Sequence, residues 1–223
     1  DTWSETFVNG VRATYTVNDI TGNNGSSYTN SYSSSGVLLS QSGVYDSGVL
    51  TGDTYTTTYN ANGSVASYSV SGNTGNNVLS GGTTAAVLRG NGGFDEYQFG
   101  RGSGQDRIIN GTGSGTIAQG ELDVGPGVST NQLWLQRSGN DLAVNILGTH
   151  DQAIVANWFG GNADAQLARI VTADGSVLDT QINQLVQAMA TYASANSGFD
   201  PATSTQAPND PALQNAIGSA WHH

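Results

Sequence analysis

The stretch from Gly75 to Phe99 repeats every nine residues, and two of its three repeats place an oxygen-bearing side chain at the same position, where it could bind a hard cation. Written against the nonapeptide GGxGxDxUx, the D positions are Asn77, Ala86 and Asp95, and the U positions are Leu79, Leu88 and Tyr97. Carboxylate and carbonyl oxygens are the ligands that calcium takes, and glycines supply the positive φ of tight turns. The chemistry indicated by this stretch is therefore calcium binding.

A short strand and a tight turn must alternate to present these oxygens, as in calcium-binding parallel β-rolls, where the large U side chain points inward. With two strands per turn of the coil, repeats n and n+2 lie on the same edge. We therefore expect Asn77 to meet Asp95, and Ala86 to face the vicinity of Asp106. Between Phe99 and Asp106 the period breaks from nine residues to eleven.

The predicted metal ligands are Gly75, Asn77, Gly93, Asp95 and Asp106. Carbonyls of the two glycines would complete a cage of about six or more oxygens around Asn77 and Asp95. With one carboxylate, this site should bind calcium weakly. An ion on the edge of Ala86, which lacks a carboxylate, would depend on Asp106 and backbone alone.

Residues 1 to about 74 contain a longer repeat, in which Tyr28–Gly36 overlays Tyr55–Gly63 at an offset of 27 residues. Aromatic residues at i and i+4 could line a helix face. We favour strands, because Thr, Tyr, Val and Ser alternate and the Asn-Gly pairs at 9–10 and 62–63 are strong hairpin turns. The segment is predicted to be an array of stacked hairpins.

Four tyrosines of this repeat allow two interpretations. Tyr28, Tyr32, Tyr55 and Tyr59 would form a half-buried sheet face, or a platform on which a sugar stacks. Such a platform would bind a carbohydrate or a cell surface.

The third segment, residues 116 to 193, is predicted to be rich in strands and to end in a helix. Leu133–Gln136 and Asp141–Ile146 form a predicted hairpin, with further strands at 152–155, 167–171 and 176–178. A helix begins after Asp179 or Thr180 and presents one apolar face, formed by Ile182, Leu185, Val186 and Met189, that should close the open end of the roll.

The last segment, residues 194 to 223, begins with a stretch up to 210 that reads as an extended, mobile link. A short helix follows, capped by Asp210-Pro211, with a narrow apolar stripe of Leu213, Ile217 and Trp221. The predicted fold is all-β: a hairpin array in 1–74, a short degenerate parallel β-roll in 75–115, a β-hairpin cap with a helix in 116–193, and a mobile, secretion-signal-like tail in 194–223.

The composition of the chain excludes several classes of binding partner. The chain has no cysteine and no lysine, and its six arginines face seventeen acidic residues, for a net charge of -11. Such a chain repels nucleic acid and cannot be held by disulfides. No apolar run approaches the ~18 residues of a membrane span, and no N-terminal signal pattern is present.

The chain begins in what reads as a strand and its only methionine is Met189, so we expect a fragment of a longer protein. His222 and His223 are either the start of an expression tag or natural residues.

Several motifs together resemble the RTX, or haemolysin-type calcium-binding, proteins over about residues 75 to 223. They are Gly90–Tyr97, Phe99–Ile108, Leu133–Leu142, Asn157–Phe159, Ile170–Leu178 and Gln184–Met189. The resemblance implies Ca²⁺ as cofactor and folding outside the cell when calcium binds. It also implies export by a type I secretion apparatus that reads an uncleaved C-terminal tail, with a passenger domain upstream in the same chain. Departures at Asn77, Ala86, Asn91 and Ser103 leave open a cap whose hydrophobic packing has largely replaced the ions.

No arrangement of a nucleophile with a base and an acid stands out in the sequence, and His150 is expected to be an exposed turn residue beside Asp151. The leading hypothesis is a non-catalytic, calcium-binding folding and secretion module of a secreted, extracellular protein. The alternative is an adhesin module that binds a carbohydrate or a surface through the aromatic face of the N-terminal hairpins.

Overall fold

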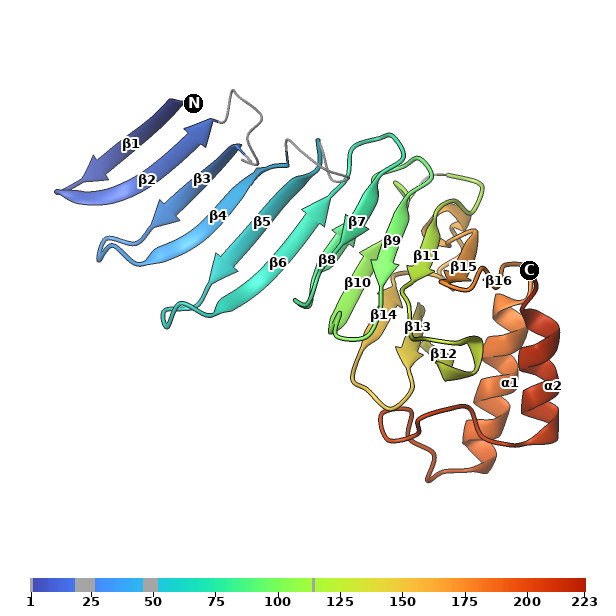
Figure 1. Ribbon diagram of the computed structural model, residues 1–223. Coiled ribbons are helices and arrows are strands. Elements are labelled where there is room, and N and C mark those ends of the chain that lie inside the picture. Colours follow the sequence, from blue (N-terminus) through green and yellow to red (C-terminus); the bar gives the residue numbers. More distant parts are fainter. Residues whose placement is uncertain (1, 19–26, 46–51, 114) are drawn as a thin grey trace.

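The computed structural model describes residues 2–18, 27–45, 52–113 and 115–223. These residues are mostly β, with two α-helices and no closed barrel. One sheet has eleven strands in the order β1-β2-β3-β4-β5-β6-β8-β10-β14-β13-β12, and a second has five in the order β16-β15-β11-β9-β7. We call them sheet A and sheet B. In Figure 1, β1–β6 extend as a row from the layered body, and the helices lie at the opposite end.

The N-terminal part of sheet A is an antiparallel meander. Its strands are β1 (Thr2–Val8), β2 (Val11–Asn18), β3 (Ser27–Tyr32), β4 (Leu38–Val44), β5 (Thr54–Tyr59) and β6 (Val65–Ser71). Asn9 and Gly10 join β1 to β2 with φ of 53° and 78°, the backbone that a two-residue hairpin turn requires. The predicted hairpins are confirmed, and the helical interpretation of the tyrosine spacing is wrong.

The two faces of this meander differ in chemistry. Register places Trp3, Val17, Tyr28, Gly43, Tyr55 and Val70 in one row across the strands. The opposite face carries hydroxyl side chains, among them Thr16, Thr29, Ser42, Thr56 and Ser69. The aromatic row continues into Leu88 and Ile108, which are buried in the core.

After β6 the chain passes alternately between the two sheets. The next strands are β7 (Val78–Ser80), β8 (Val87–Arg89), β9 (Glu96–Phe99), β10 (Gln105–Ile109) and β11 (Glu121–Val124). Sheet A pairs β6, β8, β10 and β14 in parallel, and sheet B pairs β7, β9, β11 and β15 in parallel. The predicted inward side chains, Leu79, Leu88 and Tyr97, are at most 1% exposed.

The C-terminal part completes both sheets. It contains β12 (Leu133–Ser138), β13 (Asp141–Ile146), β14 (Gln152–Val155), β15 (Arg169–Thr172), β16 (Val177–Leu178), α1 (Ile182–Ala195), α2 (Pro211–Ala220) and short 3-10 helices at Thr130–Gln132 and Ala163–Ala165. The predicted β12–β13 hairpin is confirmed. All four predicted apolar residues of α1 are buried, and Met189 Sδ lies 3.0 Å from the backbone nitrogen of Leu135 in β12.

Residues 194–210 do not form the predicted extended link. Phe199 packs on the buried Trp134, with ring centroids 4.3 Å apart. Backbone hydrogen bonds fix the segment at two further points, from Gly148 N–H to the Pro201 carbonyl (2.9 Å) and from Ala207 N–H to the Asn131 carbonyl (2.7 Å). A few aromatic and backbone contacts thus fold this polar stretch back onto the sheet.

The predicted cap and helix are confirmed in α2, but Trp221 of the predicted apolar stripe follows the last helical residue and is only partly buried. The Asp210 side chain accepts a hydrogen bond from Leu213 N–H, with Pro211 in the first turn. Leu213 and Ile217 are buried, and α2 packs on α1.

Candidate metal centre

The alternation between sheets creates two edges lined by turns. Chain segments passing from sheet A to sheet B form the first edge, with described residues at 72–77, 90–95, 110–113, 115–120 and 156–168. Segments passing from sheet B to sheet A form the second edge, at 81–86 and 100–104. The loop between β13 and β14, two strands of sheet A, joins this edge through Asp151. Successive turns of the repeat therefore lie on alternate edges. The side chain at the D position of each turn lies on the same edge as that turn.

On the first edge, Asn77 joins two carboxylates. Its backbone N–H donates to Asp95 Oδ1 (3.0 Å), and its side-chain Nδ2 donates to Asp53 Oδ1 (3.0 Å). The predicted meeting of Asn77 and Asp95 is confirmed. Asp53 was not predicted, because it precedes β5 and belongs to the hairpins rather than to the nonapeptide repeat.

On the second edge, a carboxylate again caps the backbone of the neighbouring turn. Asp106 Oδ1 accepts from Ala86 N–H at 2.9 Å, so the predicted proximity of these residues is confirmed. Asp151 likewise accepts from the N–H groups of Gly102 and Gly104, both at 2.9 Å. Asp151 was considered only as the neighbour of His150, which is exposed in a turn as expected.

Asp53, Asp95 and Asp106 each use one carboxylate oxygen and leave the other without a protein partner, and Asn77 uses its side-chain nitrogen and leaves its oxygen without one. The unpartnered atoms are Asp53 Oδ2, Asn77 Oδ1, Asp95 Oδ2 and Asp106 Oδ2. The three aspartates are at most 1% exposed and Asn77 is 9% exposed, so water does not compensate freely. A buried carboxylate oxygen without a donor is costly unless a proton or a cation satisfies it.

Glycines allow the turns of the first edge to stack closely. A Cβ on Gly93 would lie 2.3 Å from the Gly75 carbonyl oxygen, so these two predicted ligands lie in adjacent turns. A Cβ on Gly90 would lie 2.1 Å from Asp95 Oδ2. The close packing explains why no larger residue stands at either position.

We call the carboxylate and amide side chains that stack along the two edges the ladder. Burial raises the pKa of three of its carboxyls. Desolvation raises the pKa of Asp53, Asp95 and Asp106 from 3.8 to about 6, with further contributions from the Asp95 charge at Asp53 and from the Asp151 charge at Asp106. The folded state then holds these protons more tightly than the unfolded state. Their contribution to stability is present below about pH 4 and is lost as pH rises through about 6.

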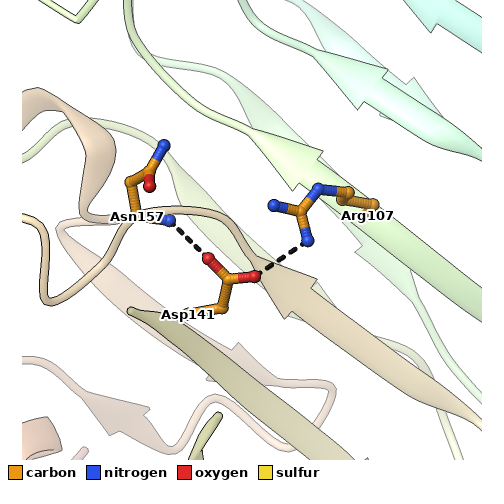
Figure 2. Close-up of polar contacts among 3 residues, drawn as sticks. All are labelled: Arg107, Asp141 and Asn157. Carbon is orange, nitrogen blue, oxygen red and sulfur yellow. Dashed lines mark hydrogen bonds and ion pairs between the residues drawn. The ribbon is translucent and has the colours of Figure 1, made fainter. Parts of the chain in front are cut away.

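A separate polar cluster ties β10 to β13 and to the turn after β14 (Figure 2). Asp141 accepts from Arg107 Nη1 (2.9 Å) through one oxygen and from Asn157 N–H (2.8 Å) through the other. Partial burial acts to raise the Asp141 pKa, but these hydrogen bonds and the guanidinium charge hold it below its usual value. Asn157 has a φ of 58°, which Asn tolerates better than most residues. Both oxygens of this carboxylate are thus satisfied, unlike those of Asp53, Asp95 and Asp106.

Asp141 is also the first residue of a segment that is related to a known family. Residues 141–181 match the family model described as the haemolysin-type calcium binding protein related domain. The match spans β13 to β16 and ends just before α1. It agrees with the resemblance seen in the downstream motifs of the sequence.

The segment that matches the family model contributes to both edges. Asp151 supplies the second edge, and Asp164 supplies the first, where its side chain accepts from the N–H groups of Thr112 (3.1 Å) and Gly115 (2.7 Å). Next to it, Asn110 Nδ2 donates to backbone carbonyls and Asn110 Oδ1 accepts from the Tyr97 hydroxyl (2.8 Å). The ladder therefore runs from the hairpins, through the repeats, into the matched domain.

The oxygen donors of the first edge are of the kind that calcium takes, and calcium is the metal in the name of the matched family. Carboxylate, amide and carbonyl oxygens suit calcium, whereas the His and Cys ligands typical of zinc are absent from the residues of the first edge. Within the described ranges, no three or more His, Cys, Asp or Glu residues group in a way that could hold a metal ion. A calcium ion on the first edge would therefore be held by Asp95, the Asn77 amide oxygen and backbone carbonyls.

The four predicted tyrosines lie away from this ladder. Tyr28, Tyr32, Tyr55 and Tyr59 are half-buried on the aromatic face of the meander. Neither helix in the described part of the chain is long and apolar enough to cross a membrane.

Proposed function

We propose that this chain is a non-catalytic, calcium-binding folding and secretion module from the C-terminal region of a larger secreted protein. We interpret the parallel strands that alternate between sheets A and B as a short β-roll. The β12–β13 hairpin and α1 would form its cap. The roll positions the ligands, and the haemolysin-type domain extends their stack.

The observation that carries this proposal is the set of buried, unpartnered oxygens on the two edges. A chain with net charge -11 repels itself, and its buried carboxylates are mostly ionised at neutral pH. Calcium at the ~0.1 to 1 mM typical of extracellular modules would neutralise them and favour folding. Calcium would thereby couple folding to arrival outside the cell.

The secretion part of the proposal concerns the rest of the protein. A passenger domain would lie upstream in the same chain, and residues 194–223 would be read by a type I secretion apparatus. The haemolysin-type match supports this through its family rather than through a contact in the structure.

Calcium titration of chelator-treated protein tests the module. At pH 7 we expect calcium to raise the melting temperature, and Asp95→Asn to abolish most of the rise, because it removes the central charge of the first edge. At pH 5, where the carboxyls hold protons, the metal-free protein should be more stable than at pH 7 and the calcium effect smaller. Calorimetry and far-UV circular dichroism measure both. A wild-type protein that melts at the same temperature with and without calcium at pH 7 would identify a cap that packs without ions.

A second candidate function is carbohydrate binding by the aromatic face. Ring contacts run along it, with centroids 6.5 Å apart for Trp3 and Tyr15 and 6.3 Å apart for Tyr15 and Tyr28. Gly43 pairs with both Tyr28 and Tyr55, so a gap without a side chain separates these two tyrosines. A row of half-exposed rings with gaps suits the flat faces of sugar rings.

Binding to insoluble polysaccharides and a glycan array tests this face. The double variant Tyr32→Ala, Tyr59→Ala should lose about tenfold or more in affinity, because two stacking surfaces are removed. Thr29→Val changes the opposite, hydroxyl face and should bind as the wild type does. Equal binding by both variants would place the glycan elsewhere, and no binding by the wild type would remove the candidate.

A further inference from the structure

Asp53 is a ladder residue that precedes the nonapeptide repeats in the sequence. It directly precedes β5 and is 1% exposed, although it lies in the hairpin part of the chain. Thr54 pairs with Ser71, so the start of β5 lies beside the end of β6, where the first edge begins. Asp53 therefore lies where the antiparallel meander of hairpins (the hairpin sheet) meets the strands that alternate between sheets A and B (the coil).

The contacts of Asp53 satisfy one of its two carboxylate oxygens. Asp53 Oδ1 accepts from Asn77 Nδ2 at 3.0 Å, while Asp53 Oδ2 is buried without a partner. The same holds for Asp95, whose Oδ2 is unpartnered and whose charge raises the pKa of Asp53. Asn77 lies between them and contributes a third unpartnered oxygen, Oδ1.

The described residues supply no counter-ion for these two carboxylates. Their ion pairs are Arg12–Glu5, Arg107–Asp141, Arg169–Glu121 and His222–Asp179, none of which involves the ladder. Lysine is absent from the sequence. Two buried carboxylates that repel each other, together with an amide oxygen, form a donor set for a hard divalent cation.

We propose that Asp53 is a ligand of a calcium ion on the first edge, held together with Asn77 and Asp95, and that this ion joins the hairpin sheet to the coil. The inference rests on the proposed calcium binding and adds a ligand from outside the repeats. Removing the ion would then loosen β5 and β6 as well as the turns of the coil.

Four variants test this role with calcium alone as the probe. Asp53→Asn keeps an oxygen for Asn77 Nδ2 but removes the charge, so calcium affinity should fall about tenfold or more. Asn77→Asp adds a third carboxylate and should raise affinity by a similar factor. Asp95→Asn removes the charge of the ligand that lies within the repeat, and it should also lower calcium affinity. Asp200→Asn, on an exposed turn, is the charge-matched control and should bind as the wild type does.

Isothermal titration calorimetry measures affinity, and hydrogen exchange with and without calcium measures protection of the β5 and β6 amides. In the wild type, calcium should slow exchange in β5, and Asp53→Asn should lose this protection while circular dichroism shows a folded protein. If the wild type binds calcium, Asp95→Asn does not and Asp53→Asn matches the wild type in both readouts, the role of Asp53 is overturned and the proposed function stands. If the wild type binds no calcium, the proposed function itself fails.

Discussion

Gly93→Ala is expected to lower the free energy of unfolding by about 3 kcal/mol or more. Gly93 has a φ of 95°, which an L-residue adopts only with strain, and a Cβ there would lie 2.3 Å from the Gly75 carbonyl oxygen. Both atoms of that contact are held by backbone, so neither can rotate away. Chemical denaturation monitored by circular dichroism measures the loss.

Gly82→Ala is the matched control for this substitution. Gly82 also has a positive φ, 62°, but no atom lies within 4 Å of its Cβ position. It should pay only the conformational strain, about 1 kcal/mol. Equal losses in the two variants would show that the turns of the first edge do not stack as closely as described.

The repeat made the stacking of these turns predictable. A fixed period with two strands per turn of the coil determines which D positions share an edge, so the pairs Asn77 with Asp95 and Ala86 with Asp106 followed from spacing alone. Asp53 and Asp151 did not follow, because each belongs to no repeat. They reach the edges through long-range strand pairing, which a local period does not contain. The ladder therefore includes residues on both sides of the predicted repeat, Asp53 before it and Asp151 after it.

The tail was mispredicted for a different physical reason. Residues 194–210 lack hydrophobic periodicity, and such composition usually indicates a solvated link. One aromatic side chain, Phe199, together with two backbone hydrogen bonds, anchors the segment against Trp134 and the turns of β12 and β13. A lone aromatic residue in a polar stretch was the available indication of packing. The adjacent helix was predictable because its cap and its apolar stripe are both local.

Deleting residues 194–223 is expected to destabilise the rest of the chain by about 3 kcal/mol or more. The deletion removes Leu213 and Ile217 from the core and uncovers Trp134, which is 1% exposed in the intact chain. It also removes the backbone pairing of His222 with Val177 in β16. Thermal melting of the truncated and intact proteins measures the effect, and an unchanged melting temperature would contradict the packing described here.

This instability determines how export has to be tested. Loss of export after the deletion would not separate a missing signal from a damaged fold, because the tail serves the core as well. Asn215→Lys with Ser219→Lys changes only exposed positions of α2 and should leave the melting temperature unchanged. If α2 is read by a secretion apparatus, the double variant should reduce export of a fused passenger while the protein remains folded. Normal export would mean that these positions of α2 serve only the fold.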